Sequence, residues 1–410
     1  MLREMSVLKD MEYVRTGGSK EELKCAKYLQ SKLKEIGLES RIEEFPVQAS
    51  KISKCSLEVT KPYKKSIPCL GYFCSGSTKG LKKELYYLRD NQPGSIAKVK
   101  GKIVLIDKYL RYWTYKDILE NGAVGFITCN GSLYEENSDI DQRELRDQLK
   151  KLGTIPGVQI NSKDAYEMVT KGASEVKIVL EQEEYKNKSR NVVCDIKGES
   201  KDTIVFTAHY DSTSLSKGSY DNATGSVGIL KIAEYFAKNK PLHNLTFIWC
   251  GSEERGLLGS HAYVNKHKKE LDNISLCINL DMIGSTMGNF VACVTGEDKL
   301  VHYVDYLSKE VDFPLEAYQD VYSSDSTPFA DKGIPAISFA RLTNMTPIHC
   351  RHDDMSILKE EVMVEDVKFI IEFSKHMANA KIIPVKKVMP DNMKEKLDIY
   401  LCRKKKEEGK

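Results

Sequence analysis

The chain has 410 residues, of which 41% are apolar and 30% are charged, and its formal net charge is only +3. A chain of this length favours two or three domains, and the near balance of charge gives no reason to expect a nucleic-acid partner. No apolar run approaches the roughly 20 residues that cross a bilayer, so we expect no membrane association.

The N-terminus and the cysteines bear on the cellular compartment. Basic residues at the N-terminus are not followed by an apolar stretch, so they do not resemble a secretory signal. The eleven cysteines are scattered and include no C-x-x-C pair, which fits free buried thiols in a reducing compartment. Both features predict a cytoplasmic protein.

The first predicted element is a helix within residues 1–50, the N-terminal part of the larger domain. Ser19 and Glu22 have the spacing of a capping box, in which the glutamate side chain reaches back to the start of the helix. Apolar residues then recur at helical spacing until Gly37 ends the helix. They are Leu23, Ala26, Leu29, Leu33 and Ile36.

Residues 51–185 are predicted to form an inserted β-rich domain. Strand-like runs occur at 102–107, 124–130, 158–160 and 176–181, with a helical stretch near 115–121. The insert contains no histidine and no tight cluster of acids, so we expect the chemistry of the protein to lie elsewhere.

Residues 186–385 are predicted to form an α/β domain in which strands and helices alternate. The expected strands are 203–210, 244–250, 275–283, 290–296 and 336–340, and the expected helices are 223–238 and 256–268. Continuous apolar runs are typical of strands covered on both faces, so the fold class is a mixed β-sheet flanked by helices. Ligands of such sheets bind outside the carboxyl ends of the strands. Residues 386–410 are predicted to be a charged C-terminal tail, in which the basic run from Arg403 to Lys406 is solvated.

Chemically versatile side chains follow three of these strands at the same kind of position. The first strand closes with His209 and Asp211, the second is followed by Glu253 and Glu254, and the third carries Asp281. Imidazole and carboxylate groups are ligands that zinc accepts. Two zinc ions need about five protein ligands, one of them bridging, and a further carboxylate to accept a proton from the nucleophilic water.

The spacing of these residues suggests a division of roles. Adjacent side chains point in different directions, so Glu253 and Glu254 can serve separately as base and ligand. His209 and Asp211 face the same side of an extended strand, so Asp211 can orient the imidazole. A structural interpretation stays open for Asp221, whose loop position also suits a turn or a helix N-cap.

Five motifs in order resemble those of the M28 zinc aminopeptidases: T-A-H-Y-D-S, Y-D-N-A-T-G-S-V-G, S-E-E-R-G-L-L-G-S, N-L-D-M-I-G and I-H-x-x-x-D. The resemblance covers roughly residues 191–380, and the helix at 19–37 is similar to the family's N-terminal segment. It implies a zinc-exopeptidase fold of the phosphorylase/hydrolase-like type. It also implies release of the N-terminal residue from peptides with a free N-terminus.

The resemblance further implies a role for each site residue. Two zinc ions are implied, with Co²⁺ or Mn²⁺ as alternatives. The implied metal ligands are His209, Asp221, Glu254, Asp281 and His349. Asp221 is the implied bridge, with a cis peptide to Asn222. Glu253 is the implied general base, and Asp211 the residue that orients His209.

Residues 51–185 resemble a protease-associated domain, through the runs GKIVLIDK, ENGAVGFITCN and IPGVQI. The late part of the sequence departs from the family's motifs at one position and offers two histidines at another. Ser326 stands where relatives frequently have histidine, which affects one wall of the cleft. Of His349 and His352, the spacing to Asp353 favours His349 as the ligand.

Other activities are compatible with this fold. A glutaminyl cyclase keeps one zinc ion, a non-catalytic binding protein loses ligands or the base, and carboxypeptidase or dipeptidase action is a further alternative. The complete set of ligands favours the aminopeptidase. Its preference for a side chain is expected to depend on a pocket near Tyr322, Phe329 and Phe339.

Overall fold

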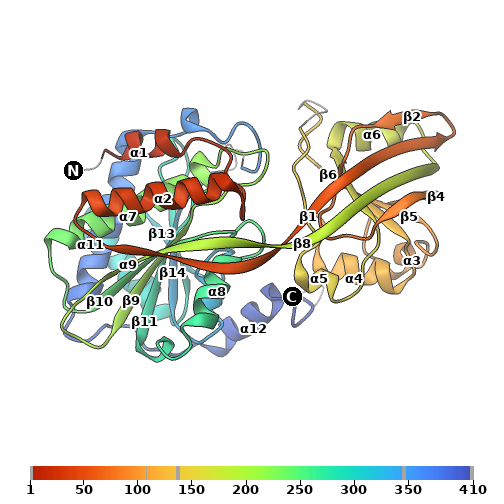
Figure 1. The fold of residues 1–410 in the computed structure, drawn as a ribbon. Coiled ribbons are helices and arrows are strands. Elements are labelled where there is room, and N and C mark those ends of the chain that lie inside the picture. The colour runs from red at the N-terminus through yellow and green to blue at the C-terminus, as the bar shows by residue number, and fades with distance from the viewer. Residues whose placement is uncertain (1–2, 108, 135–138, 344–347, 407–410) are drawn as a thin grey trace. The chain divides into compact units, whose positions relative to one another are not determined.

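The chain divides into two units, and one of them is inserted into the other. The computed structural model describes residues 3–107, 109–134, 139–343 and 348–406 (Figure 1). The larger unit comprises Met1–Pro46 and Lys188–Lys410, and the smaller unit comprises Val47–Asn187. These boundaries lie close to the expected ones after residues 50 and 185.

Both connections between the units lie within long strands, β1 (Ser40–Lys61) and β8 (Glu175–Ile196), which pair with each other. In the part of the chain that the structure describes, no helix is long and apolar enough to cross a membrane.

The larger unit contains a mixed sheet with the strand order β13-β12-β14-β11-β9-β10-β8. The strands are β9 (Thr203–His209), β10 (Asn244–Cys250), β11 (Ile274–Leu280), β12 (Asn289–Thr295), β13 (Glu316–Gln319) and β14 (Ala336–Leu342). Parallel ladders join β9 to β10, β9 to β11, β11 to β14 and β12 to β13. The pairs β12–β14 and β8–β10 are antiparallel. The expected mixed α/β class is therefore confirmed.

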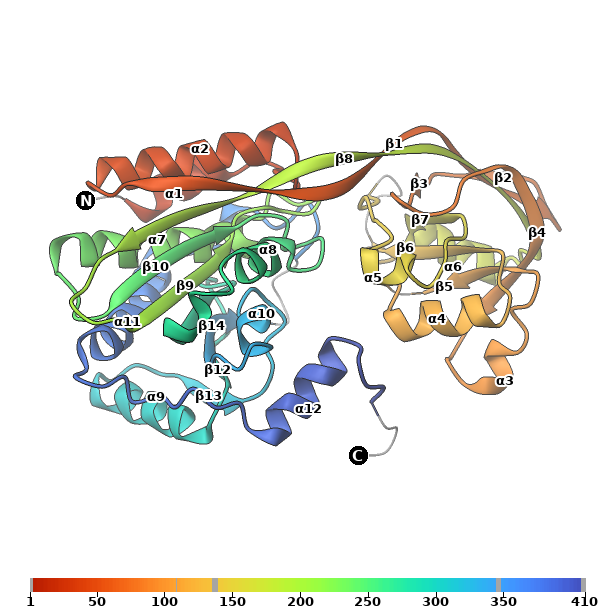
Figure 2. The same ribbon diagram turned by 60° about the horizontal axis from the view of Figure 1, so that its bottom comes forward.

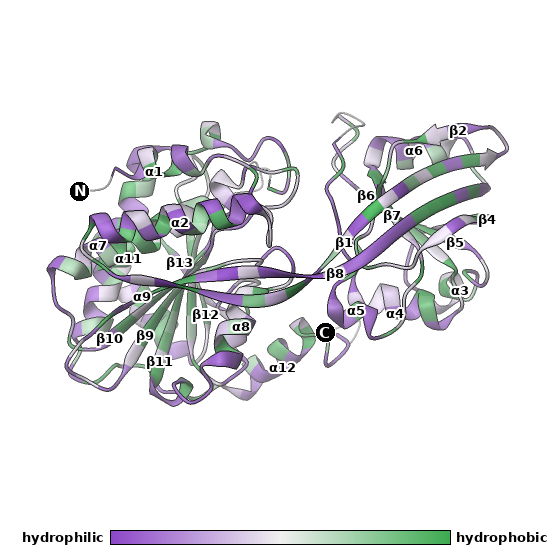
Figure 3. Ribbon diagram, in the orientation of Figure 1, coloured by the Kyte–Doolittle hydropathy of each residue, from purple (hydrophilic) through white to green (hydrophobic). Residues whose placement is uncertain are grey.

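Helices cover both faces of this sheet, because successive residues of its central strands enter two different apolar cores. In β9, Ile204 and Phe206 belong to one core and Val205 to the other. This alternation explains why the central strands are mostly apolar, as their colouring in Figure 3 shows. Residues of α1, α2, α7, α9 and α11 line the first core, and residues of α8, α10 and α12 line the second (Figure 2).

The bounds of these helices agree with the sequence pattern where a helix was expected. They are α1 (Glu4–Met11), α2 (Lys20–Glu35), α7 (Thr224–Lys238), α8 (Leu258–Lys266), α9 (Asp298–Glu310), α10 (Thr327–Ala330), α11 (Glu360–Asn379) and α12 (Asp391–Tyr400). Two short 3₁₀ turns lie at Leu271–Asn273 and Met355–Ile357.

Helix α2 shows only half of the expected capping box. The Ser19 hydroxyl accepts a hydrogen bond from the Glu22 amide at 3.0 Å, as predicted. The Glu22 carboxylate does not return to the Ser19 amide, which donates to Thr16 O instead. It is buried, where it accepts from Ser189 Oγ and pairs with Arg190.

The charged C-terminal tail predicted for residues 386–410 contains a helix, because residues 391–400 form α12. Met393 and Leu397 lie one helical turn apart, and both are buried in the second core. Arg403, also assigned to the tail, forms a forked ion pair with Asp331. Residues 407–410 lie outside the described part of the chain.

The smaller unit is a second sheet, with the order β8-β4-β5-β6-β7-β3, and β2 pairs with β1. Its strands are β2 (Lys65–Ile67), β3 (Leu70–Gly71), β4 (Thr78–Leu88), β5 (Ile103–Ile106), β6 (Gly125–Asn130) and β7 (Gly157–Asn161). Its helices are α3 (Pro93–Ile96), α4 (Tyr112–Glu120), α5 (Asp147–Lys150) and α6 (Ser162–Thr170). Strands β4 to β7 are parallel, and two apolar cores pack against them.

Candidate metal centre

The candidate site lies where three neighbouring parallel strands of the larger unit end. His209 is the last residue of β9 and is paired in register with Cys250, the last residue of β10. Glu253 and Glu254 follow β10 after a turn in which Ser252 has a positive φ of 57°. Asp281 follows β11 directly. The parallel register therefore brings the predicted residues to one edge of the sheet, as expected for ligands of an α/β sheet.

Two groups of potential ligands share one carboxylate. His209, Asp221 and Asp281 form the first group, and Asp221, Glu254 and His349 form the second. Within each group one ligand atom per residue lies within 4.8 Å of the others. Asp221 Oδ1 is 3.0 Å from His209 Nε2, and its Oδ2 is 3.1 Å from His349 Nε2. His349 Nε2 is also 3.0 Å from Glu254 Oε1.

Asp221 is held by a distorted turn, Ser219–Ala223, before helix α7. The peptide bond from Asp221 to Asn222 is cis, as the family resemblance implied. The Asn222 side chain donates to Leu280 O at 2.9 Å and accepts from the Met282 amide at 3.1 Å, on either side of Asp281. One amide side chain thus fixes the turn that carries Asp221 against the strand end that carries Asp281.

Asp353 also holds the turn that carries Asp221, through hydrogen bonds to its main chain. Its carboxylate accepts from the Tyr220 amide at 2.7 Å and from the Asp221 amide at 3.3 Å. Burial raises the pKa of Asp353 to about 7, and the nearby charge of Asp221 adds to this. The sequence offered Asp353 only as a spacing partner of His349, whereas the structure shows it bound to the main chain at Asp221.

Asp211 contacts more than the imidazole it was predicted to orient. Its Oδ1 lies 3.6 Å from His209 Nδ1, and its main-chain oxygen is 3.3 Å from the same nitrogen. The two carboxylate oxygens accept from the amides of Glu253, at 2.9 Å, and Glu254, at 3.3 Å. Asp211 therefore positions the adjacent glutamates as well as facing His209.

The site is a buried cluster that is rich in carboxylates, and both the burial and the neighbouring charges shift the pKa values of its side chains. Burial alone would disfavour the charged form of His209, but the surrounding acids, led by Glu253, raise its pKa well above the usual value. The pKa of His349 is raised in the same way, led by Glu254. Although burial opposes it, the two imidazoles hold the pKa of Asp221 below its usual range. Burial raises the pKa of Glu253 well above its usual value.

These residues fit a bound cation. The Asp281 side chain is 6% exposed, and among the described residues no hydrogen-bond donor reaches its Oδ1, which lies 3.6 Å from His209 Nε2. A buried carboxylate oxygen is costly to leave without a partner, and a metal ion supplies one. Imidazole nitrogen with carboxylate oxygen is a donor set that zinc accepts, and cobalt or manganese can also use it.

Several residues near the centre differ from expectation. Phe329 and Phe339 do not line a pocket, because both are fully buried in the two cores of the sheet. Ser326 is not an exposed wall of a cleft, since it is buried with its hydroxyl 2.9 Å from that of Ser338. Tyr322 does lie at the centre, with its hydroxyl 3.5 Å from Asp281 O. His352 is exposed and belongs to neither ligand group.

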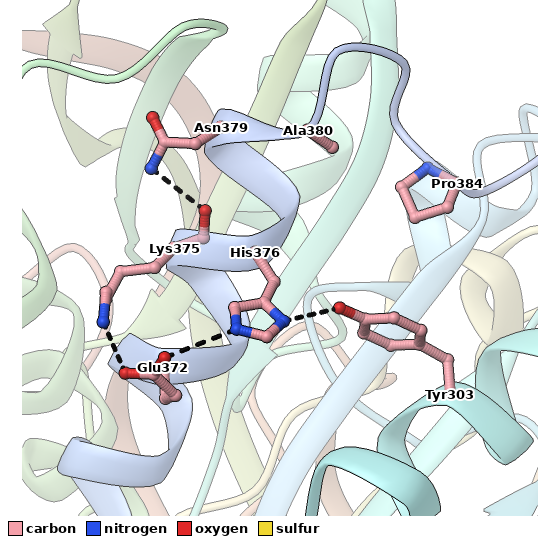
Figure 4. A pocket seen from close by; sticks show the side chains of 7 residues that line it. All are labelled: Tyr303, Glu372, Lys375, His376, Asn379, Ala380 and Pro384. Atoms are coloured by element: carbon pink, nitrogen blue, oxygen red, sulfur yellow. Dashed lines mark hydrogen bonds and ion pairs between the residues drawn. The ribbon is translucent and has the colours of Figure 1, made fainter.

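A shallow cavity of about 400 Å³ lies elsewhere on the larger unit, between residues of α9 and α11 (Figure 4). His376 Nδ1 and the Tyr303 hydroxyl are 2.8 Å apart, and His376 Nε2 is 3.4 Å from Glu372. None of the residues that line this cavity belongs to a ligand group. Its polar side chains pair with one another, and it adds nothing to the metal centre.

The fold and the site together define an α/β protein with a candidate histidine–carboxylate metal centre at the ends of parallel strands. Residues 191–373, a little less than half of the chain, match the model of peptidase family M28. The chain is 28% identical over 251 residues to leucine aminopeptidase 2 of Trichophyton rubrum. That match covers 58% of this chain and 46% of the relative, so the chain spans about half the length of the curated relatives it matches.

Two solved structures share the fold over nearly the whole chain. A zinc aminopeptidase from Bacillus subtilis is 22% identical, with a TM-score of 0.76 and coverage of 95% of this chain and 98% of that one. An aminopeptidase from Aneurinibacillus sp. strain AM-1 is 22% identical, with a TM-score of 0.72 and coverage of 94% and 95%. Because the alignments are nearly complete, the smaller unit belongs to the shared fold as well.

Proposed function

We propose that this protein is a zinc-dependent aminopeptidase that releases N-terminal residues from peptides with a free N-terminus. One observation carries the proposal: the two oxygens of Asp221 face two different histidines, at 3.0 and 3.1 Å, so one carboxylate can bridge two metal ions. Names of the relatives, which include a leucine aminopeptidase and a zinc aminopeptidase, support the same substrate class.

The two groups of residues would each hold one zinc ion. His209 and Asp281 would complete one site with Asp221, and Glu254 and His349 would complete the other. When bound, such ions lower the pKa of water and polarise a peptide carbonyl. Each group offers three ligand atoms, so a zinc ion held there would still be able to take water or substrate as a further ligand.

Glu253 is the carboxylate left over for proton transfer. Its side chain is mostly buried, its Oε2 is 4.0 Å from His209 Nε2, and it belongs to neither ligand group. In the proposed reaction Glu253 accepts a proton from the attacking water and passes it to the departing amine. Burial favours the protonated form of Glu253, which suits a group that must hold this proton between the two transfers.

The smaller unit is proposed to be a protease-associated domain. Support comes from its sequence runs and from the parallel strands β4 to β7 that they form. Neither of the two ligand groups includes a residue of this unit, so the chemistry proposed above depends on the larger unit alone.

A mixture of peptides, half of them N-acetylated, tests the function when it is incubated with zinc-loaded protein and analysed by mass spectrometry. Stepwise loss from free N-termini, with acetylated peptides intact and a chelator abolishing the reaction, is the expected result. Shortening from the C-terminus would establish a carboxypeptidase instead. A loss of 17 daltons from N-terminal glutamine without shortening would establish a cyclase, and no reaction with metal bound would remove the proposed activity.

A further inference from the structure

A residue far from the family match in sequence reaches the metal centre. Arg15 precedes helix α2 and lies outside residues 191–373, yet its side chain is 0% exposed. Burying a guanidinium is costly unless its donors are satisfied. Every acceptor that the structure gives the Arg15 guanidinium is a main-chain carbonyl oxygen, and none is a carboxylate.

The acceptors come from three segments of the larger unit. Nη1 donates to Met11 O at 3.0 Å and Tyr13 O at 3.1 Å, which fixes the side chain to its own segment. Nε donates to Tyr210 O. Nη1 also donates to Lys217 O, and Nη2 donates to Gly218 O at 2.7 Å.

These acceptors flank the proposed ligands. Tyr210 lies between His209 and Asp211, and Gly218 directly precedes the turn Ser219–Ala223 that carries Asp221. The main chain adds to the connection, because the Arg15 amide donates to Ser212 Oγ at 3.1 Å. One planar guanidinium therefore joins the strand end that carries His209 to the turn that carries Asp221.

The same N-terminal segment also contacts the turn that carries Glu253 and Glu254. A Cβ atom at Gly17 would lie 2.1 Å from Ser252 Oγ, so the two turns are in direct contact and only glycine fits there. The Arg255 guanidinium donates to Gly17 O at 3.3 Å. The segment thus contacts the elements that carry His209, Asp221 and Glu254, which are three of the five proposed ligands.

We propose that Arg15 is a positioning residue of the metal centre, which sets the separation of His209 and Asp221 and thereby the affinity for metal. This inference rests on the proposed function only in that the centre binds zinc. It needs neither a peptide substrate nor a particular reaction. A merely structural role would lower stability without changing the affinity of the protein that remains folded.

The decisive variant is Arg15→Lys, which keeps the positive charge and loses the planar guanidinium with its donors on three nitrogens. A lysine ammonium carries its three donors on one nitrogen, so it cannot reach carbonyls on three segments at once. We expect the Kd for zinc, measured by competition with a chromogenic chelator, to rise by roughly 10- to 100-fold, as for other groups that orient metal ligands. Arg15→Met, which loses the charge as well, should weaken zinc binding at least as much if it folds.

Two controls separate positioning from stability. Val304→Ala removes buried volume in α9 and lowers stability without touching the ligand-bearing turns, so its Kd for zinc should equal that of the wild type. Arg403→Lys makes the same chemical change at an ion pair with Asp331 and should also leave the Kd unchanged. Wild-type affinity in folded Arg15→Lys would overturn the inference. Tight zinc binding by the wild type without peptide release would instead overturn the proposed function and leave the inference on Arg15 standing.

Discussion

Replacing Glu22 with glutamine should change how the stability of the protein depends on pH. The Glu22 side chain is 0% exposed, accepts a hydrogen bond from Ser189 Oγ and lies 3.0 Å from Arg190 Nη1. Burial raises its pKa from 4.5 to about 7, and this outweighs the lowering caused by Ser189 and Arg190.

The sign and the size follow from the linkage between proton binding and folding. The unfolded chain releases the Glu22 proton near pH 4.5, whereas the folded protein keeps it until about pH 7. The stability that Glu22 contributes is therefore fully present below pH 4.5 and is lost as the pH rises through 7. At 1.36 kcal/mol per pH unit, the loss amounts to roughly 3 kcal/mol. Glu22→Gln has no such proton, so the free energy of unfolding of the wild type should fall relative to the variant by that amount.

Urea unfolding of both proteins at half-unit steps from pH 4 to 8 measures this difference directly, because all other titrations cancel to first order. Glu21→Gln changes an exposed neighbour on the same helix turn and should follow the wild type at every pH. A difference that stays constant, or that grows in favour of the wild type as the pH rises, would refute the reasoning. It would show that Arg190 keeps Glu22 ionised throughout.

Three further substitutions test the metal centre and the smaller unit. Glu253→Gln should retain zinc, measured by elemental mass spectrometry, while kcat falls by something on the order of 10²–10⁴, since it removes the proposed base; near-normal turnover would contradict that role. Glu254→Gln should lose zinc as well as turnover, and retention of two equivalents would remove Glu254 from the ligand set. Gly157→Ala would place a Cβ 1.9 Å from the Phe126 ring, so it should lower the melting temperature of the smaller unit while zinc binding in the larger unit is kept. Unchanged melting would show that β7 can move away from Phe126.

The clustering of the proposed ligands could be predicted because part of its signal is local. His209, Glu254 and Asp281 each follow an apolar strand, and neighbouring parallel strands end at the same edge of a sheet. The structure places all three there, together with Asp221 and His349 from loops. No positional rule of this kind applies to Asp221 and His349, and only the motifs around them indicated that they belong to the site.

The role of Arg15 could not be predicted from its surroundings in the sequence. Y-V-R-T-G-G contains no periodicity that indicates burial, and an arginine is normally exposed. Its acceptors outside its own segment are main-chain carbonyls 195 to 203 residues away, and main-chain carbonyls leave no signature in a sequence. Only the folded chain shows which carbonyl groups this guanidinium contacts.

Helix α12 shows the opposite case. The sequence does contain a local signal for this helix, apolar residues at helical spacing, but the segment is rich in charged residues. Met389, Met393 and Leu397 recur every fourth residue, which predicts one apolar helical stripe, and all three are buried in the second core. The many charged residues around them led to the prediction of a charged tail instead. A narrow stripe is enough to dock a helix, because the charged residues occupy its other faces.

The proposed ligands are held mainly through the main chain that carries them. Asp211 accepts from the amides of Glu253 and Glu254, Asp353 accepts from the amide of Asp221, and Arg15 donates to the carbonyl of Tyr210. Such contacts fix the backbone of each ligand without occupying the atoms that face the metal. One side-chain oxygen of Asp221 and one of Asp281 consequently lie within 4.8 Å of each other despite their like charge, which is the arrangement that a bound cation requires.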